Sequence, residues 1–251
     1  MTRHCLNCGH IAKEKYCPQC GQATNVDRVS WRSFGTEFIH TLTHAEKSIA
    51  GTTWQLIKHP GKVLDEYISG KRKKYQSPVG FFLIWVTLSI LTHRVIIANS
   101  GFHPVYLPGL TFSSPESIHA FITHSEWFYI LTFPLSAAIF FFVLARPLYS
   151  YIESIVITMY AFSVTYMFSV ICYIVGGIFS LNVLHWKFYL FQILLSLAYT
   201  LWVCISLFRK KKIKLLWLRI LIYIVINTVV VLKFLELLSI GWVRIEEYFK
   251  V

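Results

Sequence analysis

Long apolar stretches with few charges are the feature that most limits how this chain can fold. Five of them follow residue 78, at 79–98, 127–145, 154–179, 188–208 and 215–240. A helix needs roughly 20 mostly apolar residues to cross the hydrocarbon core of a bilayer. Charged residues make up 14% of the chain, whereas soluble domains carry roughly a quarter. We therefore predict an all-α membrane protein whose bundle, residues 79–251, contains about five transmembrane helices.

Lysine and arginine residues are distributed unevenly between the ends of these stretches. Residues 1–78 are strongly basic, loop 99–126 contains no Lys or Arg, and a basic run returns at 209–214. Because short cytoplasmic loops carry an excess of Lys and Arg, this alternation predicts a cytoplasmic N-terminus and a C-terminus on the other side. The first nine residues have no apolar core, so we expect no signal peptide.

Two CxxCG motifs near the N-terminus predict a zinc ribbon over residues 1–25. Two residues between thiolates let one tight turn direct both sulfurs at one ion, and four thiolates suit tetrahedral Zn²⁺. The glycine after each motif's second cysteine, Gly9 and Gly21, permits the positive φ that is needed where the backbone folds back towards the ion. We expect residues 11–16 to form a hairpin between the motifs. Disulfides or redox chemistry are the alternatives, but a cytoplasmic location and the absence of a βαβ context disfavour them. With four thiolates the site is expected to be closed and structural, and its ligands are Cys5, Cys8, Cys17 and Cys20.

The region 26–78 is expected to be cytoplasmic, basic and partly amphipathic. Aromatic and aliphatic residues recur at helical spacing over 30–42, and this helix would lie flat in the headgroup region or pack within a small subdomain. A second helix is expected over 46–58. Pro60 can open a short helix that Gly70 would close, since Pro suits the first helical position and Gly the position after the last.

A run of four basic residues directly precedes the first predicted span. It can act simply as a determinant of topology, or it can bind anionic lipid headgroups. Nucleic acid is a weaker possibility, because the ribbon offers no basic stripe interleaved with aromatic residues. The headgroup hypothesis rests on Lys71, Arg72, Lys73 and Lys74.

Two of these segments together resemble a known family. The pairing of CxxCG…YCPQCGQ at 5–22 with HPG…YISGKRKKYQSP at 59–78, followed by several spans, is similar to an uncharacterised bacterial family of multi-pass membrane proteins, a domain-of-unknown-function family. The resemblance implies a ribbon-bearing protein of the bacterial inner membrane and carries no activity. The later spans match no motif of that family.

Ionisable residues at membrane depth are costly, so each requires an explanation. A pair between Arg146 and Glu153 would lie at the inner interface. A polar path for conduction or transport is a second hypothesis, and its residues are His93, Arg94, Asn227, Lys233 and Glu236. The last two are also spaced for an ion pair along one helix face.

Histidines of the first outer loop offer a further possibility. His103, His119 and His124 could form a second metal site or a proton-responsive patch. A spacing of five residues between the last two disfavours one helix face, and no HExxH motif is present.

Three classes of function remain open from the sequence. The first is a membrane protein whose ribbon docks a cytoplasmic partner or regulates the bundle. The second is a pore, channel or transporter of small solutes or lipids, built as a homo-oligomer. The third is a membrane enzyme acting on lipid or envelope precursors. We favour the first, because no nucleotide, phosphate-loop or nucleophile-elbow motif is present.

Overall fold

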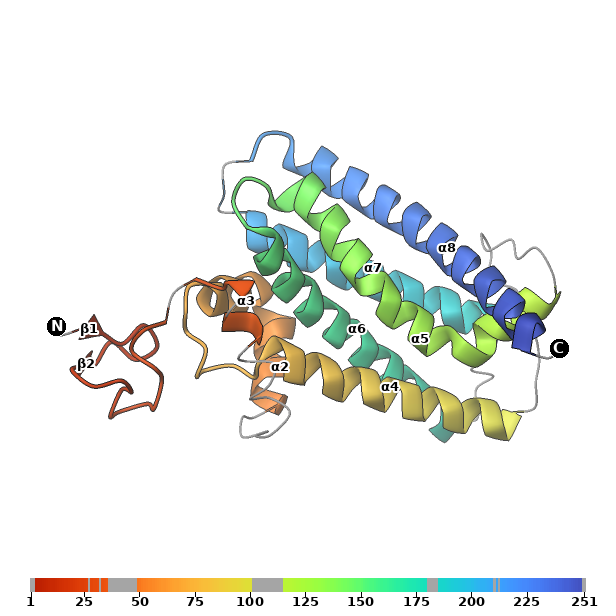
Figure 1. Cartoon of the computed structure of the whole chain (residues 1–251), viewed down its shortest axis with the longest axis horizontal. Helices are drawn as coiled ribbons and strands as arrows, with labels where there is room; N and C mark the ends of the chain where they lie inside the picture. Colours follow the sequence, from red (N-terminus) through yellow and green to blue (C-terminus); the bar gives the residue numbers. More distant parts are fainter. Residues whose placement is uncertain are drawn as a thin grey trace.

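The computed structural model describes residues 3–26, 28–31, 33–35, 49–100, 115–179, 185–209, 211 and 213–249. Among the described residues, the long helices α4 to α8 lie side by side along the long axis of the molecule (Figure 1). The cysteine-rich segment lies beyond one end of this bundle, next to two short helices. The chain's two termini lie at opposite ends, as an N-terminal ribbon and an odd number of long helices require.

A two-stranded antiparallel sheet forms the start of the ribbon. Strand β1 (Arg3–His4) pairs with β2 (Ile11–Ala12), and Tyr16 forms a further bridge with Ala23. Each CxxCG motif is therefore the turn of its own hairpin. The expected hairpin over 11–16 is wrong, because β2 pairs backwards across the first motif and not forwards towards the second.

Two short helices separate the ribbon from the bundle. Helix α2 covers Ile49–Lys58, and α3 covers Pro60–Ile68 with Pro60 in its first turn. Gly70 follows with φ of 106°, a conformation that glycine adopts without the steric cost of a Cβ atom. The predicted short helix and its glycine terminator are thus confirmed. Of the helix expected over 30–42, Ser30, Trp31 and residues 33–35 are described, and all but Ser30 are helical; the remainder lies outside the described residues, as do 46–48.

The long helices alternate in direction along the bundle (Figure 1). They are α4 (Pro78–Ser100), α5 (Pro115–Phe140), α6 (Tyr151–Ile178), α7 (Trp186–Phe208) and α8 (Leu216–Phe249). A π-helical turn, η1 (Phe141–Ala145), continues α5. Pro78 opens α4 as expected, and the Ser77 hydroxyl accepts a hydrogen bond from Gly80 N–H at 3.2 Å.

Four of the described helices are long and apolar enough to cross a membrane. They correspond to α4, α6, α7 and α8. In α5 the apolar stretch among the described residues is shorter, Ile130–Ala145. The multi-pass membrane character therefore holds, whereas the count of about five spans is not confirmed.

Helix α6 is the centre of the bundle. Half of its apolar window is buried (50%), compared with 28% for α4, 22% for α7 and 17% for α8. Its buried Ser154, Thr158 and Ser163 hydroxyls donate to carbonyls one turn earlier, at 3.0, 2.8 and 2.6 Å. These polar groups are satisfied within the helix, as an apolar interior requires. The outer helices instead expose large apolar side chains, which suits contact with lipid.

Candidate metal centre and the surface that holds it

The two CxxCG turns of the ribbon have the same backbone geometry. In the first, Cys5 N–H donates to His10 C=O and Gly9 N–H donates to Cys5 C=O, at 2.9 and 2.8 Å. In the second, Cys17 N–H donates to Gln22 C=O and Gly21 N–H donates to Cys17 C=O, both at 2.8 Å. The glycines have φ of 79° and 68°, as predicted. Each turn therefore presents its two sulfurs to the same side.

The four cysteine sulfurs form one compact cluster. Cys5 and Cys17 are buried, and Cys20 is half-buried. The Sγ atoms of Cys5 and Cys20 lie 3.5 Å apart and those of Cys8 and Cys17 3.6 Å apart. All four lie within 4.8 Å of one another. Disulfide bonds measure about 2.05 Å, so these cysteines are not paired covalently.

The cluster has the dimensions of a tetrahedral metal site. A metal–sulfur bond of about 2.3 Å gives about 3.8 Å between sulfurs at the corners of a tetrahedron. The observed separations bracket this value. Cys5, Cys8, Cys17 and Cys20 can therefore hold one metal ion, with no coordination position left over for a substrate.

Gln22, the last residue of the second turn, attaches the ribbon to the bundle. Its side chain is 5% exposed. Its amide nitrogen donates to the Gly70 carbonyl at 2.9 Å, and its amide oxygen accepts from the backbone N–H groups of Arg72 and Lys73, both at 3.1 Å. We call residues 69–77, which connect α3 to α4, the entry loop. One glutamine thus makes three hydrogen bonds to the backbone of the entry loop.

A glycine contact reinforces this attachment. A Cβ atom added at Gly70 would lie 2.8 Å from Leu6 Cδ1 and 3.5 Å from Val26 Cγ1. The Leu6 side chain from the first CxxCG turn therefore packs directly on the Gly70 backbone. The ribbon and the entry loop approach too closely for any larger residue at this position.

Glu66 of α3 holds the entry loop from the other side. Its carboxylate accepts from Lys71, Lys74 and the Tyr75 hydroxyl, at 3.2, 2.8 and 2.5 Å. Partial burial alone would raise the pKa of Glu66, but the hydrogen bonds from Lys74, Tyr75 and Lys71 outweigh it and lower the pKa to about 2. Two lysines of the basic run therefore pair with this carboxylate, and both Lys73 and Lys74 stay exposed to solvent.

A second polar cluster joins α3 to two other turns of the same end. The Tyr149 hydroxyl donates to Asp65 at 2.5 Å, and Lys211 Nζ donates to the same carboxylate oxygen at 2.8 Å. Lys211 also contacts the Tyr149 hydroxyl and lies 4.2 Å from the centre of its ring. Burial, and then the bond to Asp65, raises the pKa of Tyr149. The cluster ties together α3, the turn before α6 and the turn before α8.

Arg28, just after the ribbon, reaches the start of α6. Its guanidinium donates to both carboxylate oxygens of Glu153, at 2.6 and 3.1 Å. The Glu153 side chain is 4% exposed, and it also caps α6 by accepting from Ser150 N–H at 2.8 Å. The expected pair between Glu153 and Arg146 is wrong, because the helix cap turns the carboxylate towards Arg28.

Helices α2 and α3 are held on α7. A Cβ atom at Gly61 would lie 2.3 Å from the Ser206 carbonyl oxygen, and Gly61 N–H donates to the Ser206 hydroxyl at 3.0 Å. Tyr199 and Trp202 donate from α7 to the carbonyls that end α2, at 3.3 and 3.1 Å. The glycine of the HPG motif thus permits contact between the backbones of α3 and α7.

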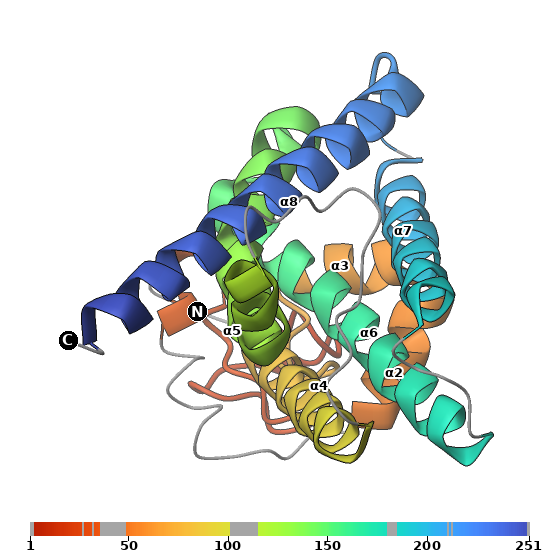
Figure 2. The same cartoon turned by 90° about the vertical axis from the view of Figure 1, so that its right-hand side faces the viewer.

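The residues of the predicted polar path are distributed over two helices. His93 and Arg94 are on α4, where the His93 ring lies 6.1 Å from that of Tyr173. Lys233 and Glu236 form the expected ion pair on α8, at 2.7 Å, and Asn227 lies on the same helix. Helix α5 lies between α4 and α8 in both views (Figures 1 and 2). The structure does not gather the five into one group, and conduction along them stays a prediction.

The predicted outer-loop histidines cannot be placed. His103 lies outside the described residues, and the side chains of His119 and His124 lie outside the described part of α5. Within the described residues, the cysteine cluster is the group able to hold a metal ion. Gln22, Asp65, Tyr149 and Lys211 were not predicted as site residues; Gln22 directly follows the second CxxCG motif, whereas no local pattern marks the other three.

Comparison with known proteins bears on one part of this arrangement. A family model described as "Protein of unknown function (DUF3667)" matches residues 46–90. The matched segment contains α2, α3, the entry loop and the first half of α4, and it therefore includes Gly70, Arg72 and Lys73, to which Gln22 of the ribbon is bonded. A search of curated proteins and a search of solved structures returned no match.

Proposed function

We propose that this chain is a membrane-embedded regulatory protein whose ribbon binds Zn²⁺ and, when loaded, holds the entry loop of the bundle. The single observation that supports it is the triple attachment of Gln22 to Gly70, Arg72 and Lys73. A ribbon on a flexible tether would need no such attachment. The metal state of the ribbon is thereby linked to the segment that leads into the first span.

Zinc is the ion that best fits the donor set. Four thiolates at tetrahedral spacing favour Zn²⁺ over hard cations such as Mg²⁺ or Ca²⁺, which prefer oxygen ligands. Because all four positions are protein ligands, the role is structural and not catalytic. In so small a unit the metal supplies most of the folding free energy. Loss of the ion would therefore release Gln22 from the entry loop.

The ribbon end is proposed to face the cytoplasm. The turns at this end carry a surplus of basic residues, which is typical of cytoplasmic loops. They are Lys71, Arg72, Lys73, Lys74, Arg146, Arg209, Lys211 and Lys214. Anionic headgroups remain proposed ligands for the exposed members of this set. The bacterial inner membrane is proposed from the family resemblance alone.

A protein partner on the free side of the ribbon is a second proposal. Ile11 and Tyr16 are 54% and 56% exposed, although they are apolar and belong to the ribbon's own hairpins. Leu6 and Gln22 face the entry loop instead. The ribbon therefore has one side for the bundle and an apolar side for a second molecule.

The test compares two glutamines of the same ribbon in the full-length protein in nanodiscs. Gln22→Ala removes the attachment, whereas Gln19→Ala changes an exposed glutamine. We expect about one zinc per chain in both variants, following the four-thiolate stoichiometry. Backbone amide exchange at Arg72 and Lys73 should accelerate in Gln22→Ala and in chelated wild-type protein, and stay slow in Gln19→Ala.

Two results would overturn the proposal. Unchanged exchange at Arg72 and Lys73 after complete zinc removal would show that the ribbon does not control the entry loop. A protein whose residues 3–26 stay folded without bound metal would show that the four cysteines do not form a zinc-dependent ribbon. The two outcomes are distinguishable, because metal content and amide exchange are measured on the same sample.

A further inference from the structure

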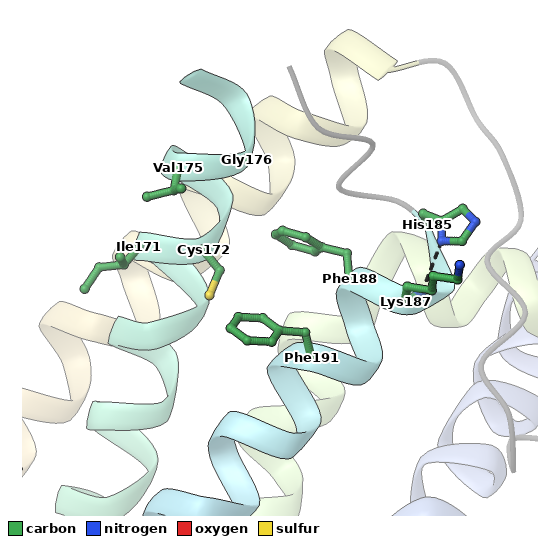
Figure 3. A pocket seen from close by; sticks show the side chains of 8 residues that line it. All are labelled: Ile171, Cys172, Val175, Gly176, His185, Lys187, Phe188 and Phe191. Carbon is green, nitrogen blue, oxygen red and sulfur yellow. Dashed lines mark hydrogen bonds between the residues drawn. The ribbon is translucent and has the colours of Figure 1, made fainter. Parts of the chain in front are cut away.

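The end of the bundle opposite the ribbon contains an apolar crevice. It lies between the last turns of α6 and the first turns of α7 and has a volume of about 540 Å³. Phe188 and Phe191 of α7 point towards Cys172 of α6 (Figure 3). Val175 and Gly176 complete the α6 wall. The interior of the crevice is therefore apolar.

The crevice opens on the lipid-facing surface of the bundle. Val175 and Phe191 are 42% and 56% exposed, although both are large apolar residues on helices long enough to span a membrane. Water would be a poor solvent for such a groove, and an acyl chain is the apolar molecule that a bilayer supplies. The shape and lining of the crevice thus suit one hydrocarbon chain.

A cationic group lies where the crevice reaches the end of α7. His185 and Lys187 lie beyond Phe188, at the end of the helix, with their side chains directed away from the apolar interior (Figure 3). The His185 ring nitrogen accepts from Lys187 N–H at 3.2 Å, so the ring caps the helix. Among the described residues, Lys187 makes no ion pair; its ammonium lies 5.8 Å from the Trp186 ring. The positive end of the α7 dipole is at the same place.

Acidic residues do not offset this charge on the two helices. Within the described parts of α6 and α7 the sole carboxylate is Glu153, and it pairs with Arg28 at the other end of the bundle. Trp186 beside Lys187 is the type of residue that lies at headgroup level. An apolar groove that ends at an unpaired cation is complementary to an amphiphile with an acidic head.

We propose that this crevice binds a bilayer phospholipid with an anionic headgroup. One acyl chain lies against Cys172, Phe188 and Phe191, and the phosphate lies near Lys187 and the start of α7. This inference requires the bundle to lie in a bilayer and is independent of the metal in the ribbon. It assigns a lipid ligand to an end of the molecule that the ribbon does not contact.

The experiment uses the full-length protein in nanodiscs with two photoreactive lipids. The probes are phosphatidylglycerol and phosphatidylcholine carrying the same diazirine acyl chain, and adducts are mapped by mass spectrometry to residues 171–191. One cation near an anionic headgroup should give about a fivefold preference for phosphatidylglycerol, which corresponds to about 1 kcal/mol. Lys187→Ala should abolish this preference.

Two further variants separate headgroup recognition from filling of the crevice. Arg244→Ala removes an exposed cation at the same end of the bundle, on α8, and should keep the fivefold preference. Cys172→Trp should fill the crevice, because this side chain points towards Phe188 and Phe191 (Figure 3), and should lower adducts from both probes severalfold, while the protein remains monodisperse.

Three outcomes would overturn the proposal. Equal labelling by the two probes in wild-type protein would show that the crevice does not prefer an anionic headgroup. Labelling spread evenly over all lipid-facing helices would show that the crevice is not a specific lipid site. Bis-maleimide cross-links between Cys172 residues of two copies, in place of lipid adducts, would show that a second copy covers the crevice.

Discussion

The two ends of the bundle are built by different interactions. At the ribbon end, side chains from five segments are connected by ion pairs and short hydrogen bonds through Asp65, Glu66 and Glu153. At the opposite end, Phe188 and Phe191 border an apolar crevice with one unpaired cation among the described residues. Directional bonds specify one arrangement, whereas apolar surface accepts whatever the bilayer supplies. Loss of one contact at the ribbon end would therefore change a defined arrangement of side chains, whereas the apolar end has no such defined set of bonds to lose.

Metal removal should have the largest effect and should be confined to one end. Chelation, or Cys17→Ser, removes an interaction of about 10–16 kcal/mol in zinc-binding peptides. We expect residues 3–26 to lose all slow amide exchange, while α6 to α8 keep their protection. Hydrogen exchange by mass spectrometry checks this, with zinc-replete protein as the control. An equal loss of amide protection in α8 would contradict the expectation that the effect of the metal is confined to the ribbon end.

The same substitution at two glycines should have opposite signs. Gly61→Ala places a Cβ atom 2.3 Å from a backbone oxygen of α7, so it should destabilise the fold by about 3 kcal/mol, at the upper end of overpacking costs. Gly177→Ala, near the other end of α6, meets nothing within 4 Å, and should stabilise by about 0.5 kcal/mol through helix propensity. Thermal unfolding in detergent measures both. A neutral Gly61→Ala would show that α3 does not rest on α7.

Removal of one cation from each of two ion pairs should have unequal costs. Arg28→Ala leaves Glu153, 4% exposed, without its partner. We expect a loss of about 2 kcal/mol, below the 3–5 kcal/mol of fully buried pairs because Arg28 itself is 61% exposed. Lys233→Ala breaks a pair whose lysine is 67% exposed and should cost less than about 0.5 kcal/mol. Equal losses in denaturation midpoints would contradict this difference.

Acid should weaken the ribbon end through Glu66. Its pKa is lowered from 4.5 to about 2 in the folded protein, so the carboxylate stabilises the fold fully above about 4.5. This contribution is lost as the pH falls from 4.5 through about 2. The difference in melting temperature between wild type and Glu66→Gln should be constant above that range and vanish below it. A difference that persists at pH 2 would exclude Glu66 as the titrating group.

Local patterns were sufficient to predict the ribbon turns and the short helices. The positive φ values at Gly9 and Gly21, the start of α3 at Pro60 and its end before Gly70 all follow from neighbouring residues, and each is confirmed. The division into 1–25, 26–78 and 79–251 stays a prediction. The count of about five spans is not confirmed, because among the described residues α5 has an apolar stretch of Ile130–Ala145, shorter than the other four.

Long-range partners could not be predicted in this way. Arg28 and Glu153 are 125 residues apart, and Gln22 and Gly70 are 48 apart. The proposed partner of Glu153 was the nearest basic residue, Arg146, because a sequence ranks partners by distance along the chain. Three-dimensional packing brings residue 28 to the start of α6, where the helix cap already orients the carboxylate. The polar contacts of Asp65, Glu66 and Glu153 at the ribbon end became visible only with the fold.

The attachment of Gln22 has a consequence for how the sequence of the entry loop can change. Its three bonds run to main-chain atoms of residues 70, 72 and 73, and every residue type except proline presents the N–H groups needed at 72 and 73. Substitution of Arg72 or Lys73 would alter the charge of the loop without deleting a hydrogen-bonding partner of Gln22. Substitutions can therefore change the surface charge of the entry loop without removing its backbone hydrogen bonds to Gln22. Glutamate at position 22 would not be equivalent, because it would keep the two acceptor bonds and lose the donor to Gly70.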